Sequence, residues 1–237
     1  MNYHCQKLKS GLYLVATPLG SARDITLRAL DVLCSCDALA AEDTRSMRKL
    51  LNIHNIPLKD RPILSYNDFN GDRVRPTIMN WLNSNMAVAY ASDAGMPLIA
   101  DPGYQLSKQA AEAGFYVTAV PGASACITAL SLSGLPTDRF FFEGFLPVSK
   151  EKRRQKLKEL SSIPSTLIFY ESPKRLIKMF EDLIAIMGEN RRAVIARELT
   201  KKFEQIISGT LGELHALILK KPLKGELVVL LYRPLTT

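Results

Sequence analysis

Long apolar stretches are missing from this sequence of 237 residues. A transmembrane helix needs about 20 consecutive apolar residues, and no stretch of the chain approaches that length. The N-terminal run Leu12–Ala16 is soon broken by Thr17 and Pro18, so it makes a poor core for a signal peptide. We therefore expect a protein that stays in the cytoplasm.

Cysteine is also scarce, with four residues in the chain. Cys5, Cys34, Cys36 and Cys126 do not form a disulfide framework in a chain of this length, and the cytoplasm keeps thiols reduced. Cys34 and Cys36 form a C-x-C pair, but no second Cys or His pair lies at zinc-finger spacing. The sequence predicts reduced, mostly buried thiols and no metal site.

The composition is that of a folded protein, with 47% hydrophobic and 23% charged residues. The length suits one large domain or two domains of roughly 110–120 residues each. The net charge of +8 favours an anionic partner, either nucleic acid or an anionic membrane. Charge alone leaves open a basic surface that is solvated and has no partner.

Short apolar runs rich in β-forming residues alternate with helical patterns, which predicts an α/β fold with mainly parallel strands. The predicted strands are Leu12–Ala16, Ala38–Ala41, Met86–Ala91, Tyr116–Val120, Phe140–Phe145, Thr166–Tyr170, Ala193–Ala196, Phe203–Ile207 and Leu227–Tyr232. We expect the last two to form an antiparallel pair at a sheet edge. The predicted helices include one capped by Asp24 with Leu27, Leu30 and Leu33 on one face, and Leu106–Ala113 and Ser124–Leu132. Pro121-Gly122 marks a domain junction, which predicts domains 1–120 and 121–237.

Three loops follow predicted strands and are rich in small residues. They are Pro18-Leu19-Gly20, Ser92-Asp93-Ala94-Gly95 and Pro121-Gly122-Ala123-Ser124. Open α/β sheets bind ligands at the carboxyl ends of their strands, and small residues let the backbone approach a ligand closely. Ordinary turns use the same residues, but three such loops at one edge predict a nucleotide-like ligand, with Asp93 on a ribose hydroxyl or an ammonium group. Neither a dinucleotide fingerprint nor a P-loop is present.

A series of longer motifs surrounds these loops. They are Val15–Gly20, Asp24–Leu30, Ala41–Arg45, Ser92–Ile99, Asp101–Tyr104, Pro121–Ala125, Ser133–Phe140, Glu143–Pro147, Phe169–Pro173 and Ala196–Lys201. In this order the motifs resemble the ribosomal small-subunit RNA methyltransferase I family of the tetrapyrrole-methylase superfamily. The resemblance runs from about Gly11 to Tyr232.

The resemblance implies two α/β domains of the tetrapyrrole-methylase type, with the active site in the cleft between them, and a homodimer. It further implies S-adenosylmethionine as methyl donor and, as acceptor, a cytidine ribose 2′-hydroxyl of 16S ribosomal RNA, free or in the 30S subunit. The implied cofactor-binding residues are Pro18, Gly20, Asp93, Ala94, Gly95, Pro97, Leu98, Ser124, Ala125, Tyr170 and Ala196.

Three positions depart from the family pattern. Met96 stands where the family usually has threonine, which removes a hydroxyl contact to the cofactor. Ser21 replaces a usual asparagine, and Lys174 stands where a histidine often follows Ser172-Pro173. A histidine base is therefore not assigned there.

A ribose hydroxyl is a weak nucleophile, so a side chain that accepts its proton would accelerate transfer. The candidates for this catalytic role are Glu42, Asp43, Glu198 and Lys201, with Glu171 as a further one. The alternative is structural, with Glu42 paired to Arg45 and Glu198 paired to Lys201.

The densest basic run is Lys150–Lys158, which we expect to be a mobile loop leading into a helix. Such a run is often only a solvated face, but the family resemblance and the net charge favour phosphate binding. The predicted RNA-binding residues are Arg45, Lys150, Lys152, Arg153, Arg154, Lys174 and Arg175. The target nucleotide has to leave its stack, and the aromatic candidates to receive it are Tyr66, Phe69 and Tyr104, of which at least one belongs in the core.

Two other functions stay open on the sequence. A methylase of the same fold could act on a porphyrin or another small molecule, although the basic run and the motifs beyond the cofactor loops argue against it. A non-catalytic ribosome-assembly factor could bind RNA with a degenerate cofactor pocket, and Met96 is the feature that favours it.

Overall fold

The computed structural model describes residues 3–232 and divides into two compact units, Met1–Ser124 and Ala125–Thr237. The sequence-based boundary after residue 120 falls at the end of the last strand of the first unit, and the division in the structure falls four residues later, where a helix begins. Within residues 3–232 no helix is long and apolar enough to cross a bilayer.

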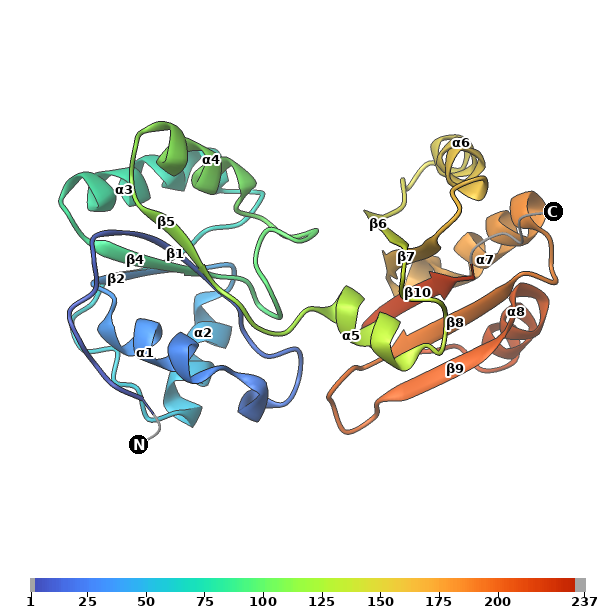
Figure 1. Cartoon of the computed structure of the whole chain (residues 1–237), viewed down its shortest axis with the longest axis horizontal. Coiled ribbons are helices and arrows are strands. Elements are labelled where there is room, and N and C mark those ends of the chain that lie inside the picture. Colours follow the sequence, from blue (N-terminus) through green and yellow to red (C-terminus); the bar gives the residue numbers. More distant parts are fainter. Residues whose placement is uncertain (1–2, 233–237) are drawn as a thin grey trace. The chain divides into compact units, whose positions relative to one another are not determined.

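The first unit is a parallel five-stranded sheet with helices on both faces (Figure 1). The strands are β1 (Gly11–Val15), β2 (Ala38–Ala41), β3 (Ile63–Ser65), β4 (Ala87–Ala91) and β5 (Val117–Val120), in the order β3-β2-β4-β1-β5. The helices are a short 3-10 turn (Ala22–Asp24), α1 (Leu27–Ser35), α2 (Thr44–Ile53), α3 (Gly71–Asn83) and α4 (Tyr104–Glu112).

Alternate residues of the central strands pack into two separate cores in this unit. Tyr13 and Val15 of β1 face a cluster with α1 and α2, whereas Leu12 and Leu14 face a cluster with α3 and α4. Every residue of β1, β2 and β4 is buried, as expected for parallel strands covered on both faces. The carboxyl ends of these strands therefore form the accessible edge at which loops can build a site.

The second unit has a mixed sheet of five strands. Its strands are β6 (Phe140–Phe145), β7 (Thr166–Glu171), β8 (Arg192–Arg197), β9 (Gln205–Thr210) and β10 (Leu227–Leu231), in the order β6-β7-β10-β8-β9. The helices are α5 (Ala125–Leu132), α6 (Lys150–Ser161), α7 (Pro173–Met187) and α8 (Leu211–Lys220). Helices α6, α7 and α8 pack on one face of the sheet, and α5 contacts β7 and β10.

The prediction of mainly parallel strands is confirmed in the first unit and is wrong in the second, where only β6 and β7 run parallel. The predicted edge pair is also wrong, because β10 lies between β7 and β8 while β9 lies at the edge. The segment Leu227–Leu231 is buried at every position, so it occupies the centre of the sheet. Local hydrophobicity reveals a buried strand but not its neighbours.

Two local predictions need correction. The cap of α1 is Thr26, whose side chain accepts a hydrogen bond of 3.1 Å from the Ala29 N–H, and not Asp24. The basic run at 150–158 is not a mobile loop but part of α6, capped by the Ser149 hydroxyl. In both cases a hydroxyl residue nearer the helix satisfies the exposed N–H groups of the first turn.

The prediction that all cysteines are reduced is wrong for Cys5 and Cys34, which form a disulfide. Residues 3–8 run beside α1, where the Gln6 N–H donates to the Ser35 hydroxyl at 3.0 Å. Beside this contact the Cα atoms of Cys5 and Cys34 lie 5.5 Å apart, within the usual range for a disulfide. Cys36 and Cys126 are buried thiols, as predicted.

Candidate functional site

The loop after β1 is bonded directly to the loop after β4. Thr17 and Gly95 exchange two backbone hydrogen bonds, of 2.9 and 3.0 Å, which form an isolated antiparallel bridge. The Thr17 hydroxyl also donates to the carbonyl of Ser92 at 3.2 Å. These bonds fix the two loops against each other at the carboxyl edge of the sheet.

The loop after β5 approaches the same point, and two glycines permit this close packing. Gly95 has a φ of +79°, and a Cβ there would lie 3.1 Å from Leu19 and 3.2 Å from the carbonyl oxygen of Ala123. A Cβ on Gly122 would lie only 2.7 Å from the Cβ of Ala16. The predicted convergence of three small-residue loops on one edge is therefore confirmed.

The loop between β4 and α4 also holds unusual backbone conformations. Leu98 and Ala100 have φ values of 74° and 57°, a region that residues with a side chain rarely adopt. Such strain persists only where surrounding contacts enforce it, and it clusters at functional sites. This loop carries five of the residues that the family resemblance assigns to the cofactor, namely Asp93, Ala94, Gly95, Pro97 and Leu98.

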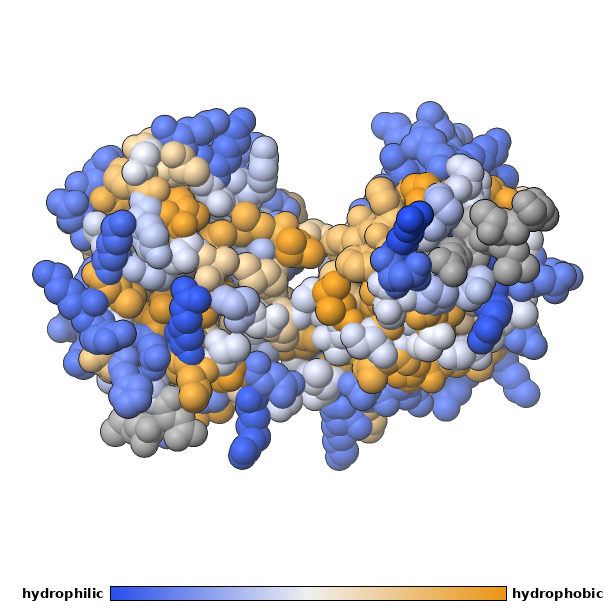
Figure 2. All heavy atoms as spheres, in the orientation of Figure 1, coloured by the Kyte–Doolittle hydropathy of each residue, from blue (hydrophilic) through white to orange (hydrophobic). Residues whose placement is uncertain are grey.

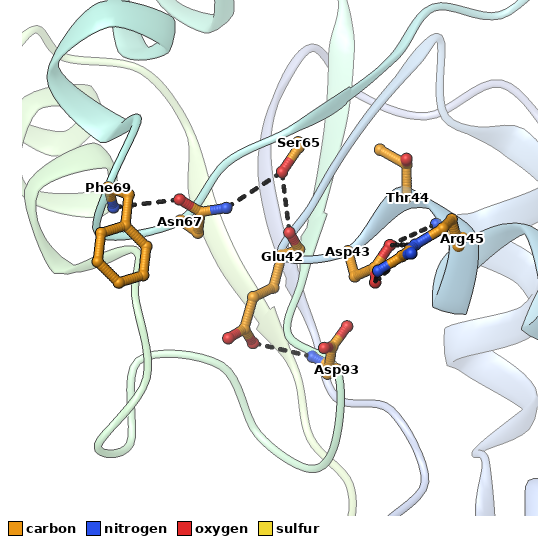
Figure 3. A pocket seen from close by; sticks show the side chains of 8 residues that line it. All are labelled: Glu42, Asp43, Thr44, Arg45, Ser65, Asn67, Phe69 and Asp93. Carbon is orange, nitrogen blue, oxygen red and sulfur yellow. Dashed lines mark hydrogen bonds and ion pairs between the residues drawn. The ribbon is translucent and has the colours of Figure 1, made fainter.

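A pocket opens beside these loops, at the carboxyl ends of β2, β3 and β4 (Figure 3). Its volume is about 360 Å³, which lies within the ~300–1,000 Å³ typical of small-molecule sites. The lining residues are Glu42, Asp43, Thr44, Arg45, Ser65, Asn67, Phe69 and Asp93. Asp93 belongs both to this pocket and to the loop after β4, so the pocket and the converging loops are neighbours.

The carboxylates in this pocket differ sharply in their electrostatics. Asp43 immediately precedes α2 and pairs with Arg45 at 2.6 Å, and the hydrogen bonds from Arg45 lower the pKa of Asp43 to about 2. Burial raises the pKa of Glu42, although the Asp93 N–H donates to its Oε2 at 3.2 Å. Burial and the nearby Asp43 likewise raise the pKa of Asp93. Of the two catalytic candidates in this pocket, Glu42 is therefore a better proton acceptor than Asp43.

A further carboxylate lies on the strained loop next to the pocket. Burial, followed by the charge of Glu42, raises the pKa of Asp101 to about 7, despite a hydrogen bond from Ser92. Asp101 is not among the predicted site residues. Its position two residues before the positive-φ Gly103 was visible in the motif Asp101–Tyr104, but its burial was not.

The predicted cofactor residues are distributed over both units. Pro18, Gly20, Asp93, Ala94, Gly95, Pro97, Leu98 and Ser124 lie on the three converging loops of the first unit. Ala125 begins α5 in the second unit, where the Tyr170 hydroxyl accepts a hydrogen bond of 3.1 Å from the Cys126 N–H. Ala196 is buried in β8. Tyr170 thus lies beside the first turn of α5, next to Ala125.

The four candidate catalytic residues separate into two groups. Glu42 and Asp43 line the pocket, whereas Glu198 and Lys201 form an ion pair of 3.3 Å in the second unit. The predicted structural pairing of Glu198 with Lys201 is confirmed. The pairing of Glu42 with Arg45 is wrong, because Arg45 binds Asp43 instead.

The predicted RNA-binding residues are not equally available to a ligand. Lys150, Lys152 and Lys174 are exposed, and Figure 2 shows hydrophilic side chains gathered over α6. Arg153 is buried, with its guanidinium 2.7 Å from Asp182 of α7, and Arg154 binds the same carboxylate at 2.6 Å. The side chain of Arg153 therefore joins two helices and cannot reach a phosphate, so the prediction that it binds RNA is wrong.

Two further arginines of that set have partners within the protein. Arg175 lies 3.2 Å from the buried carboxylate of Glu171 and donates to the carbonyl of Leu146. Arg45 keeps 89% of its side chain exposed despite the bond to Asp43. Arg175 thus has a structural partner four residues before it, whereas Arg45 is accessible at the pocket.

Sequence reasoning missed three polar residues that line the pocket, Thr44, Ser65 and Asn67. Thr44 lies within the motif Ala41–Arg45, so its neighbourhood was visible. Ser65 and Asn67 lie at the end of β3 and just beyond it, and this strand of three residues is too short for a periodic signal.

Comparison with known proteins identifies the family. Residues 11–215 match the family model for tetrapyrrole (corrin/porphyrin) methylases. A ribosomal RNA small subunit methyltransferase I of Vibrio cholerae is 46% identical over 93% of this chain and 76% of its own length. The protein of the same name from Bacillus subtilis is 41% identical over 91% of this chain and 72% of its own.

Solved structures show the same fold at much lower identity. Diphthine synthase is 18% identical with a TM-score of 0.71, covering 93% of this chain and 89% of its own. Uroporphyrin-III-C-methyltransferase from Thermus thermophilus is 18% identical with a TM-score of 0.65, covering 94% of each chain. These likenesses establish the predicted two-domain tetrapyrrole-methylase fold.

Proposed function

Since the chain belongs to the ribosomal RNA small subunit methyltransferase I family of the tetrapyrrole methylases, we propose that it methylates small-subunit ribosomal RNA with S-adenosylmethionine as donor. The observation that carries this proposal is identity of more than 40% to relatives of that name over at least 91% of the chain. The specific acceptor that we propose, a cytidine ribose 2′-hydroxyl of 16S RNA, rests on the motif resemblance.

The loops of the first unit fit an adenosylmethionine ligand. The absence of side chains at Gly95 and Gly122 lets three loop backbones meet, and loops at the carboxyl ends of strands are where open α/β sheets bind nucleotides. We propose that Pro18, Gly95 and Leu98 of this unit hold the cofactor. The cofactor roles of Tyr170 and Ala196 in the second unit rest on the family resemblance. When bound, the cofactor supplies a methyl group on an electrophilic sulfonium.

We propose that Glu42 accepts the proton of the ribose hydroxyl. Its raised pKa makes it a stronger base than Asp43, whose pKa of about 2 reflects the bond to Arg45. The Asp93 N–H holds one carboxylate oxygen of Glu42, which restricts the side chain in the pocket. Glu198 and Lys201 are paired with each other, and Lys201 also contacts Glu226 at 2.9 Å, so we assign that pair to holding its loop.

We further propose cytoplasmic localisation, which the ribosomal RNA methyltransferase relatives support, and a homodimer, which rests on the family resemblance. The Cys5–Cys34 disulfide is an exception to the reduced thiols that are usual in that compartment. For RNA, the accessible cations Arg45, Lys150, Lys152 and Lys174 are the proposed contacts. Arg153 is omitted because Asp182 neutralises it inside the second unit.

The rival functions have less support. The cobalt-precorrin-4 and uroporphyrin-III methyltransferases among the solved structures share only the fold, at 15–18% identity. The degenerate cofactor pocket of an assembly factor depended on Met96, but Met96 packs against the core cluster that contains Tyr90 and Leu106. The methionine therefore has a packing role that does not require loss of the cofactor.

A tritium-transfer assay tests the proposed function. Labelled S-adenosylmethionine is incubated with the protein and isolated small subunits, naked small-subunit RNA or a porphyrin. We expect label in RNA or subunits and none in the porphyrin. Label in the porphyrin alone, or in nothing while the cofactor binds, would refute the proposal.

The proton acceptor is tested with Glu42→Gln in the same assay. We expect kcat to fall by about 10²–10⁴-fold, the usual contribution of a positioned base, with unchanged cofactor affinity by calorimetry. Glu198→Gln is the matched control, because it removes a carboxylate that lies in the other unit and is paired with Lys201. Equal activity of Glu42→Gln and the wild type would exclude Glu42 as the base.

A further inference from the structure

The rim of the pocket carries an aromatic ring that has no packing role. The side chain of Phe69 is fully exposed, although a Phe side chain stabilises a folded protein when it is buried. The other two aromatic candidates differ from it. Tyr66 is buried in the core against Tyr90, and Tyr104 is 62% exposed but does not line the pocket.

The exposed position of Phe69 is fixed by the turn that carries it. The Phe69 N–H donates to the Asn67 side chain at 3.1 Å, and the Asn67 N–H donates to the Asn70 side chain at 2.8 Å. The Asn70 amide in turn donates to the carbonyl of Ser65 at the end of β3, at 3.0 Å. These bonds anchor the turn to the sheet, so the ring is held outward by an ordered backbone.

The ring and the proposed base face the same pocket. In Figure 3 the side chain of Glu42 lies between those of Phe69 and Asp93, and its carboxylate accepts a hydrogen bond from the Asp93 N–H. A nucleotide consists of a flat base joined to a ribose, so a ring at the rim and a proton acceptor farther in match its two parts. Stacking on an aromatic side chain is the usual way in which proteins hold an unstacked base.

From this arrangement we infer that the pocket at the ends of β2, β3 and β4 is the acceptor-nucleotide subsite, in which Phe69 stacks on the base and directs the ribose toward Glu42. The inference rests on the proposed RNA methylation and adds the residue that selects an extruded nucleotide. Because every base has a flat face, Phe69 contributes affinity for an unstacked nucleotide and no choice among bases.

Two substitutions separate stacking from simple apolar contact. Phe69→Leu keeps an apolar side chain but removes the flat ring, and Phe69→Trp keeps a ring. We expect Phe69→Leu to raise the KM for small subunits by about 5- to 150-fold, the range that loss of a stacked base gives, with cofactor affinity unchanged. Phe69→Trp should restore a KM near that of the wild type. Ile53→Ala, at the far end of α2 from the pocket and also exposed, is the matched control.

A second measurement does not depend on catalysis. The chain has one tryptophan, Trp81, which packs against the core of the first unit. In Phe69→Trp, a base that stacks on the new indole should quench its emission. We therefore expect a short oligocytidylate to quench Phe69→Trp saturably and to leave the emission of the wild type, with Trp81 alone, nearly constant.

The outcomes distinguish the subsite from the proposed function. Quenching without methyl transfer to RNA by the wild type would support the subsite and refute the function. Methyl transfer by the wild type, together with a KM for Phe69→Leu within about twofold of the wild type and no quenching in Phe69→Trp, would overturn the subsite and leave the function intact.

Discussion

The surroundings of the Asp101 side chain raise its pKa far above that of a free aspartate. Its pKa of about 7, raised by burial and then by Glu42, lies above the unfolded value of about 3.9. Between these values the folded protein binds more protons than the unfolded chain. The contribution of Asp101 to the free energy of unfolding therefore falls as the pH rises from about 4 to 7, and stays low above that range.

Replacing the Asp101 carboxylate by an amide should remove this loss of stability at high pH. We expect Asp101→Asn to raise the free energy of unfolding at about pH 8 by on the order of 1–3 kcal/mol, with no difference from the wild type near pH ~4. Urea unfolding at several pH values measures this. Asp43→Asn is the opposite control, because the lowered pKa of Asp43 predicts a loss of stability at high pH. A gain for Asp101→Asn that does not vary with pH would contradict the explanation.

Residue types alone do not predict such roles, as the basic run shows. Lys152 and Arg153 are neighbours with the same charge, yet one is exposed and the other is buried against Asp182. The difference depends on which face of α6 meets α7, and on an acidic partner 29 positions along the chain. The same limit explains why the sequence predicted Glu42 as the partner of Arg45, whereas in the structure Arg45 binds Asp43.

Among the secondary-structure elements, the packing of α6 against α7 depends strongly on the charged groups between the two helices. The carboxylate of Asp182 is almost fully buried and binds both Arg153 and Arg154. Burial opposes its ionisation, but the hydrogen bonds from the two arginines outweigh burial and lower its pKa. The ionised form therefore holds the basic helix on the second unit.

Removing this carboxylate should destabilise the protein far more than removing a surface partner. We expect Asp182→Ala to lower the free energy of unfolding by about 3–5 kcal/mol, because Arg153 is left buried and unpaired. Glu159→Ala, which breaks the surface pair of Lys156 and Glu159, should lower it by ~1 kcal/mol or less.

A double substitution checks that explanation by denaturant unfolding. Arg153→Met combined with Asp182→Leu should recover most of the stability that Asp182→Ala removes, since neither charge is then buried alone. If the double variant were as unstable as Asp182→Ala, the unpaired arginine would not be the cause.

The elements themselves are largely predictable where a local pattern exists. The predicted bounds of β6 and β2 match the observed ones, because apolar runs of buried strands are visible in the sequence. The central position of β10 and the antiparallel strands of the second unit are not predictable in this way, because strand order depends on contacts between distant segments. The glycines and prolines of the site loops reveal them in the sequence, but the pocket beside them depends on the position of β3.

For the whole molecule, the net charge of +8 should attract RNA through the cations that the fold leaves exposed. We expect Lys150, Lys152 and Lys158, changed together to Gln, to weaken binding to small-subunit RNA. The slope of log affinity against log salt should decrease in size by about 2, because each phosphate that is no longer neutralised reduces it by roughly 0.7. Filter binding across a salt series measures it.

The matched control is Arg153→Met with Asp182→Leu, which changes the interior charges of the second unit. Its salt slope should equal that of the wild type. An unchanged slope in the lysine variant would show that α6 does not contact phosphate.

That the cofactor lies between the two domains, and that the protein is a dimer, stay predictions.

The disulfide between Cys5 and Cys34 also changes the connectivity of the chain. It closes a covalent ring that contains β1, the loop with Pro18 and Gly20, and most of α1. Arg23 and Arg28 are exposed sites for trypsin within that ring. A single cut there should open the ring without releasing a fragment, so that the nicked protein migrates as one band until a reductant separates its two pieces.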